Sequence, residues 1–179
     1  MRTLIAGYRP YELGIFKSSQ PEAQVLKDFM KFKLKEYIDN GTEWFIIQGY
    51  TGIEFYAALA MIELREEYTF KYSVLKPFHG FDERYKEDDA LLLHQILDNS
   101  DHHQFIFDRP YESPRMFPMI NRFLIDHSDQ ALVVYDEQAD SKTRFIYDQM
   151  LELKEDRPYN IERIQFDEIN AFIDSAYER

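Results

Sequence analysis

Short apolar segments alternate with amphipathic helical patterns along the whole chain, and this alternation restricts the fold more than any other feature. Apolar runs predict strands at 4–6, 44–47, 72–75, 104–107 and 131–135, with a weaker sixth at 161–164. Helical spacing predicts helices over 21–39, 53–67, 88–99, 114–128, 147–154 and 167–177. The nearly continuous apolar runs favour strands that are covered on both faces. Strands that alternate with helices pair in parallel through right-handed crossovers. The sequence therefore predicts an α/β fold: a single three-layer domain over residues 1–179 with a mostly parallel sheet of about six strands.

Charge and cysteine content narrow the classes of function. The chain has 21 Lys and Arg against 33 Asp and Glu, which gives a formal net charge of −12. Residues 1–80 hold ten of each sign, so all of the excess negative charge lies in residues 81–179. This balance disfavours binding of long nucleic acid by neutralisation of its phosphates. The absence of Cys excludes disulfides, thiolate metal sites and thiol nucleophiles.

The start of the chain predicts a buried strand rather than an export signal. The apolar stretch 3–6 is short, and Arg9 follows it closely. No run in the sequence approaches the ~20 apolar residues that span a bilayer. We therefore expect a cytoplasmic protein without a membrane partner.

In a parallel α/β sheet, ligands bind at the carboxyl ends of the strands, so the loops after strands are where function is sought. The strongest such loop follows the strand 44–47, where Gly49, Tyr50, Thr51 and Gly52 open a helix in a G-x-x-G turn. Glycines let the backbone approach a ligand, and the first N–H groups of the helix face an anion. The alternative is an ordinary tight turn. Glu54, in the first helical turn, either interacts with the helix dipole or contacts ribose and activates water at an anomeric carbon.

Three further segments supply candidate ligand contacts. After the first strand, Gly7, Tyr8 and Arg9 offer close backbone approach, an aromatic ring and a planar cation for phosphate, or form an ordinary surface loop. Prolines stiffen the turn that carries Tyr111 and Ser113, although Ser113 also suits a helix cap. The helix 114–128 carries a third set.

That set comprises Asn121, Arg122 and Asp126. Either Asn121 and Arg122 reach over the strand ends to a ligand, or Arg122 and Asp126 form a surface ion pair at i,i+4. The five His residues show no metal-binding spacing such as H-x-x-x-H, and no Ser lies in a G-x-S-x-G elbow. The sequence therefore predicts neither a metal site nor a serine hydrolase triad.

The segments GYRPYELGIFK (7–17), IIQGYTGIEFYAA (46–58), RPYESP (109–114) and NRFLIDHSD (121–129) together resemble the YpsA family of small Firmicute proteins. The resemblance runs over essentially the whole chain, and RPYESP is its most specific piece. It implies a Rossmann-like sheet, because the wider superfamily includes the Lonely-guy phosphoribohydrolases and the DNA-processing protein DprA. It also implies a nucleotide-derived ligand, one pocket formed by the four segments, and a link to growth and cell division in Gram-positive bacteria.

Three departures from these relatives bear on the site. Ala6 stands where other members carry a hydroxyl residue. GYTGIE keeps two glycines, a threonine and a glutamate of the Lonely-guy PGGxGTxxE motif at different spacing, so Glu54 does not simply inherit a catalytic role. The stretch 137–144 has no glycine, which argues against a second phosphate-binding loop there.

Three functions compete at this point. The first is a sensing or regulatory module that binds a small phosphorylated ligand of the ADP-ribose or NAD class; the residues specify no cofactor. The second is an enzyme that hydrolyses an N-glycosidic bond of a nucleotide, with Glu54 assisting water. The third is DNA binding, which the acidity disfavours unless Lys27, Lys31 and Lys35 form a dedicated basic face. The many Phe and Tyr residues either fill the core or form the face of a homodimer.

Overall fold

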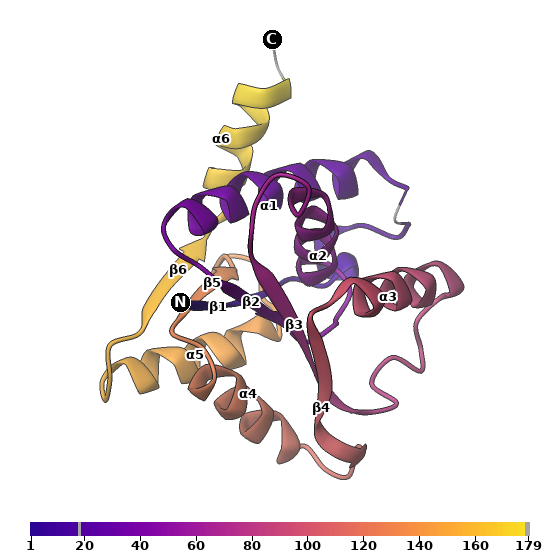
Figure 1. Ribbon diagram of the computed structural model, residues 1–179, viewed down its shortest axis with the longest axis vertical. Helices are drawn as coiled ribbons and strands as arrows, with labels where there is room; N and C mark the ends of the chain where they lie inside the picture. Colours follow the sequence, from indigo (N-terminus) through magenta and orange to yellow (C-terminus); the bar gives the residue numbers. More distant parts are fainter. Residues whose placement is uncertain (18, 178–179) are drawn as a thin grey trace.

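The computed structural model describes residues 1–17 and 19–177, and its centre is a parallel sheet of six strands in the order β4-β3-β2-β1-β5-β6 (Figure 1). The strands are β1 (Arg2–Gly7), β2 (Trp44–Ile47), β3 (Lys71–His79), β4 (His102–Pro110), β5 (Gln130–Val134) and β6 (Asn160–Ile164). All the strand pairs are parallel. The predicted α/β class is therefore confirmed, and the sheet is Rossmann-like.

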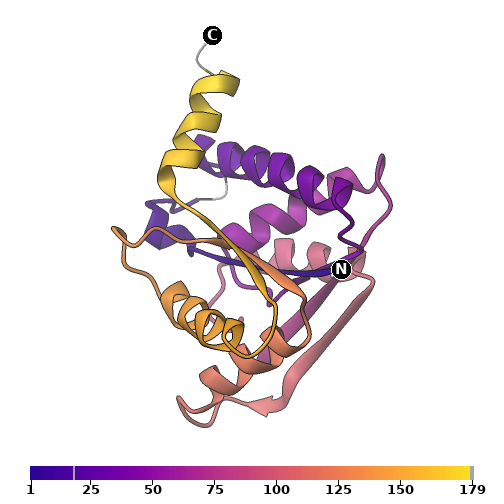
Figure 2. The ribbon, with the colours of Figure 1, turned by 90° about the vertical axis from the view of Figure 1, so that its left-hand side faces the viewer.

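Helices cover the two faces of the sheet. They are α1 (Pro21–Asp39), α2 (Ile53–Leu64), α3 (Glu87–Asn99), α4 (Met116–Asp126), α5 (Thr143–Lys154) and α6 (Phe166–Tyr177), with a short 3-10 helix η1 (Pro10–Leu13) after β1. Viewed with the sheet edge-on, α1, α2 and α3 lie on one side and α4 and α5 on the other, while α6 lies beside α1 (Figure 2). Among the described residues, no helix is long and apolar enough to cross a membrane.

The order in which the chain adds strands to the sheet reverses at β1. From β1 the chain moves outward through β2, β3 and β4, and it then returns to the other side of β1 to form β5 and β6. The loops after β1 and β5 therefore diverge at a switch point, which is where α/β sheets open a crevice for ligands. This topology directs attention to the carboxyl ends of β1, β2 and β5.

The core forms where apolar strands meet the helices. The strands β1, β2 and β5 are almost completely buried, as their sequences predict. Helix α2 lies so close to β1 that a Cβ added to Gly7 would stand 2.7 Å from the Cβ of Ile53. Gly7 is therefore needed for contact between helix and strand.

The predicted burial of every strand on both faces is wrong for β4. All of its residues are exposed or half-buried, because β4 is the edge of the sheet and has a neighbouring strand on one side only. Some predicted helix bounds also differ. Helix α5 begins at Thr143 instead of 147, since the Ser141 hydroxyl accepts the Thr143 N–H and starts the helix earlier.

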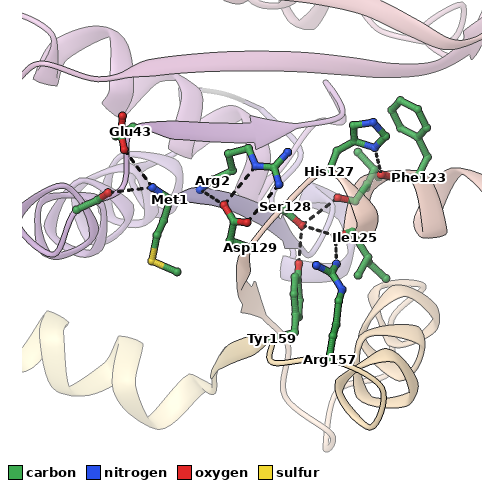
Figure 3. Close-up of polar contacts among 12 residues, drawn as sticks. Met1, Arg2, Glu43, Phe123, Ile125, His127, Ser128, Asp129, Arg157 and Tyr159 are labelled. Carbon is green, nitrogen blue, oxygen red and sulfur yellow. Dashed lines mark hydrogen bonds and ion pairs between the residues drawn. The ribbon is translucent and has the colours of Figure 1, made fainter.

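A network of polar contacts closes the amino-terminal edge of the sheet (Figure 3). Arg2 binds Asp129 through its backbone N–H and through its guanidinium, at 2.7–3.2 Å. Ser128 bonds Tyr159 and the last turn of α4. These contacts hold the end of α4 against β1 and β6, on the side of the sheet opposite to the switch point.

Candidate functional site

The loops after β1 and β2 are in direct backbone contact at the carboxyl edge of the sheet. The Ile53 N–H, the first of α2, donates to the Tyr8 carbonyl at 3.0 Å. Gly52 has φ +95°, and a Cβ there would stand 2.2 Å from the Tyr8 oxygen and 2.8 Å from the Cα of Arg9. Only glycine fits this position without displacing the neighbouring loop. The two predicted ligand loops therefore form one structural unit.

Glu54 stabilises that unit from within. Its side chain is buried, and its Oε1 accepts the backbone N–H groups of Gln48 at 2.6 Å and Gly49 at 3.2 Å. Burial raises the pKa of Glu54 to about 7, although Arg9 and the backbone N–H groups act in the opposite direction. The Glu54 carboxylate therefore takes the place that an anionic ligand would have at these two N–H groups, and they do not face a ligand.

Arg9 is the cation of this edge. Its guanidinium carbon lies 3.3 Å from the centroid of the Tyr50 ring, which fixes the side chain by a cation–π contact. Burial raises the pKa of Tyr50, so its phenol stays neutral. Six other arginines form ion pairs with Asp or Glu: Arg2, Arg65, Arg109, Arg122, Arg144 and Arg163. Arg9 forms none with any residue that the structure describes, although it is half-buried.

A groove of about 290 Å³ runs beside the start of α2. Thr51 and Gly52 line it at the helix start, and Tyr11 and Phe16 line it from the segment after β1. Its cationic and anionic side chains are Lys17, Lys27, Lys86 and Asp89. The cap residue of α2 gives no side-chain hydrogen bond to the first turn. The volume of the groove is close to the lower end of the range for small-molecule sites, ~300 Å³.

The crevice at the switch point is filled by Tyr8. Its ring is 1% exposed and stacks on Phe166 at 5.5 Å. Its hydroxyl accepts the Asp136 N–H at 2.8 Å and lies within 3.0 Å of the carbonyls of Asp136 and Ala139. Tyr8 therefore joins the loop after β1 to the loop after β5 and presents no face to a ligand there.

Asp136, two residues after the end of β5, is also engaged by the backbone. Its carboxylate accepts the N–H groups of Gln138 at 2.9 Å and Phe166 at 3.1 Å, which lower its pKa. The glycine-free loop after β5 is thus held by side chains rather than shaped around a phosphate.

The other predicted contacts lie elsewhere. Tyr111 and Ser113 follow β4, three strands away from β1, or ~14 Å at the usual strand spacing. Tyr111 packs against Phe78 and Phe117. The Ser113 carbonyl accepts the Met116 N–H at the start of α4.

The α4 residues face the opposite side of the sheet from α2. Asn121 donates to Gln149 of α5 at 2.7 Å, and Arg122 pairs with Asp126 at 3.0 Å on the surface. Because α4 runs back toward the amino ends of the strands, Ile125 in its last turn belongs to the polar network of Figure 3, and Asp126 is the next residue in the helix. The structure therefore brings together the loops at 7–9 and 49–54, and it places the other two segments apart from them.

Sequence comparison shows which family the chain belongs to. The family model described as the YspA SLOG family, YpsA, matches residues 3–169. The chain belongs to the YpsA family. A UPF0398 protein of Listeria monocytogenes serotype 4a is 39% identical over 170 residues, covering 95% of this chain and 94% of the relative. UPF0398 proteins of Staphylococcus aureus are 35% identical over 170 residues, covering 94% and 91%.

Two solved structures share the YpsA-family fold. DprA from Helicobacter pylori superposes with TM-score 0.53 at 17% identity, over 99% of this chain and 80% of that one. DprA from Streptococcus pneumoniae superposes with TM-score 0.51 at 16% identity, over 89% of this chain and 50% of that one. This chain thus spans half the length of the Streptococcus protein, and the likeness establishes the Rossmann-like fold alone.

Sequence reasoning missed Tyr85 and Phe81 of this YpsA-family site. The Tyr85 hydroxyl donates to the Gly49 carbonyl at 2.8 Å, and burial raises its pKa. Phe81 contacts Tyr50 edge-on at 5.9 Å. Both follow β3, which neighbours β2, so a search of the loop after the next strand would have found them. Among residues 1–17 and 19–177, no group of three or more His, Asp or Glu is placed to hold a metal ion.

Proposed function

We propose that this YpsA-family protein binds a small phosphorylated nucleotide derivative, of the ADP-ribose or NAD class, beside the loops after β1 and β2. The observation that carries the proposal is Arg9. A half-buried guanidinium that forms no ion pair with any described carboxylate, although its charge acts on the buried Glu54, and that is fixed over an aromatic ring at a strand end, is a strong phosphate ligand. The phosphate lies between Arg9 and Thr51 at the start of α2, where the cap residue Gly52 supplies no side chain.

The groove beside α2 supports the same proposal. Tyr11 is 62% exposed and Phe16 69% exposed, so flat apolar surface is available for a nucleobase. Lys17 and Lys86 line the groove without an ion pair to any described residue, so they are available to a second phosphate. A ligand with a base and two phosphates uses all of these groups.

The role that we propose is sensing rather than turnover, with an output in growth and cell division, as the family resemblance implies. Glu54 is 4% exposed and engaged with Gln48 and Gly49, so it does not reach a ligand outside the loop. The runner-up, hydrolysis of an N-glycosidic bond, is favoured by one observation: a carboxyl with pKa about 7 suits general acid–base catalysis. That reaction requires the turn at 48–50 to open.

DNA binding is the third candidate, since the Helicobacter DprA structure is described in terms of its single-stranded DNA binding mode. The lysines of α1 give it little support here. Lys27 and Lys31 both pair with Glu63, and Lys33 is buried among carboxylates. Two of the three lysines of the predicted basic face, Lys27 and Lys31, are therefore engaged by a carboxylate, which argues against DNA binding through this face.

Calorimetric titration with AMP, ADP, NAD and ADP-ribose tests the proposal. We expect one of these to bind, and Arg9→Ala to weaken it by about 10- to 100-fold, because a charge-assisted contact contributes about 1.5–3 kcal/mol. Arg115→Ala is the matched control, since Arg115 is exposed and lies at the start of α4. No binding by any of the four, or equal loss in both variants, contradicts the proposal.

The same titrations separate the alternatives. Products read by chromatography show turnover, and hydrolysis that Glu54→Gln abolishes supports the enzyme. If a DNA oligonucleotide binds, its affinity falls steeply with salt and none of the four nucleotides binds, DNA binding is the function that is supported.

A further inference from the structure

The two edges of the sheet differ in how they are protected from pairing. At one edge, β6 has five residues and carries Glu162 and Arg163 in its centre. The other edge is β4 (Figure 1). It has nine residues, and its charged residues, Asp108 and Arg109, are confined to its end. Natural proteins blunt edge strands with short length, charges or proline, because a long uncharged edge pairs with another strand. The β4 edge lacks these devices over residues 102–107.

The surroundings of β4 leave this edge accessible. No helix covers its outer side in either view (Figures 1 and 2), and the strand is at most half-buried along its length. The exposed rings of Tyr111 and Phe117, 46% and 42% exposed, extend the apolar surface beyond its end. A chain of net charge −12 repels another copy in general, but residues 102–107 contain no acidic or basic side chain other than His. The β4 edge is thus the part of the sheet where approach of a second copy costs least.

We propose that β4 pairs antiparallel with β4 of a second copy of this chain, which joins the two sheets across a twofold axis. In such an interface the same residues face each other from both copies. Opposite residues of an antiparallel pair lie on the same face, and side chains alternate between faces, so two opposite residues are both odd or both even in number. One residue therefore faces its own copy: Gln104, Phe105 or Ile106.

Charge complementarity selects Phe105 as that residue. In this register His102 stands opposite Asp108 of the second copy, at both ends of the pairing. The Nδ1 atom of His102 bonds Ser73 at 2.8 Å, which leaves Nε2 for the incoming carboxylate. Asp108 is 88% exposed and uses Oδ1 for His79, which leaves Oδ2. A register centred on Ile106 would instead place His103 opposite Arg109, a pair without a carboxylate and so without this attraction.

The regular part of the strand fits the same register. β4 is in continuous register with β3 from His102 to Phe107, and the register shifts beyond that point. Centring on Phe105 pairs positions 103–107 within this regular part, with His103 opposite Phe107 and Gln104 opposite Ile106, and places the His102–Asp108 contact where the register of β4 shifts. Opposite Phe105 rings add an aromatic cross-strand contact.

The absence of cysteine makes a direct test possible, because each introduced thiol is the only one in the chain. Residues directly opposite in an antiparallel pair have Cα atoms ~4.5–5.5 Å apart, within reach of a disulfide. Under mild oxidation, Phe105→Cys is expected to form a covalent dimer at least tenfold faster than Leu91→Cys, a control on the exposed face of α3. Gln104→Cys and Ile106→Cys are each expected to crosslink slowly alone and rapidly when mixed.

Sedimentation velocity of the unmodified protein provides the second measurement and should show a dimer. Circular dichroism of each reduced variant establishes that it is folded. A monomer at all concentrations overturns the proposal and leaves the edge to a different partner. A dimer in which Phe105→Cys crosslinks no faster than Leu91→Cys also overturns it, because the interface then lies elsewhere.

Discussion

Replacement of Glu54 by Gln should remove a pH dependence of stability that the wild-type chain carries. Glu54 is 4% exposed, and burial raises its pKa from 4.5 to about 7. In the unfolded chain the group is solvated and ionises near its ordinary pKa. Between these two values the folded chain binds a proton that the unfolded chain lacks, so stability falls as the pH rises through this window.

The size of the effect follows from the two pKa values. One pKa unit corresponds to about 1.4 kcal/mol, and ionisation of Glu54 between pH 5 and pH 8 therefore costs the folded state about 2.5 kcal/mol. The contribution is fully present below pH 4.5 and is lost above pH 7. Gln stays neutral, and its amide oxygen still accepts from Gln48 and Gly49, so the variant lacks this loss.

Urea unfolding at several pH values between 5 and 8 measures the effect. The free energy of unfolding of wild type minus that of Glu54→Gln should fall by about 2.5 kcal/mol across the range. Taking this difference cancels the contributions of the groups that titrate in both chains. Glu66→Gln, at an exposed position in the turn that follows the same helix, is the control and should show a flat difference. If the difference in unfolding free energy between wild type and Glu54→Gln is also independent of pH, the conclusion that burial raises the pKa of Glu54 is refuted.

Three further predictions concern the packing around the site and the attachment of α6. Gly52→Ala should destabilise the fold by at least about 2 kcal/mol more than Gly41→Ala in urea unfolding, because both have positive φ but only the Gly52 Cβ meets the Tyr8 oxygen; equal losses would contradict the close contact. Tyr8→Phe should lower the free energy of unfolding by about 1–3 kcal/mol, because it leaves backbone groups of the loop after β5 unpaired. A decrease below about 0.5 kcal/mol in the same assay would contradict this role of the Tyr8 hydroxyl. Lys33→Met should cost about 3 kcal/mol and increase hydrogen exchange in α6, because Lys33 Nζ lies within 3.1 Å of carboxylates from α1, β6 and α6; unchanged exchange would exclude the attachment.

The sequence predicted the elements and the class of the fold well because local periodicity determines them. Helix α1 has the predicted bounds, with Pro21 at its first turn and Gly41 at positive φ after its end. The exposure of β4 was not predictable from the strand itself, since an apolar run looks the same at the centre and at the edge of a sheet. Edge position depends on strand order, which local patterns do not encode.

The candidate site was predictable only in part, for a topological reason. The loops at 7–9 and 49–54 meet because β1 and β2 are neighbours. The α4 residues were grouped with them by family resemblance, whereas the direction of α4 carries Asp126 to the opposite edge of the sheet. The sequence also could not predict that the Glu54 side chain binds the backbone of its own turn. A Glu in the first turn of a helix can face either a ligand or that turn, and the sequence does not distinguish the two.

Hydrogen–deuterium exchange with and without ADP-ribose tests the central claim most directly, because it reports where on the chain a ligand acts. We expect slower exchange in peptides that cover 8–17 and 49–56, with no change in 109–113 and 121–129, and loss of this protection in Arg9→Ala. Protection confined to 109–113 or 121–129, or protection that persists unchanged in Arg9→Ala, would contradict a phosphate site at the loops after β1 and β2.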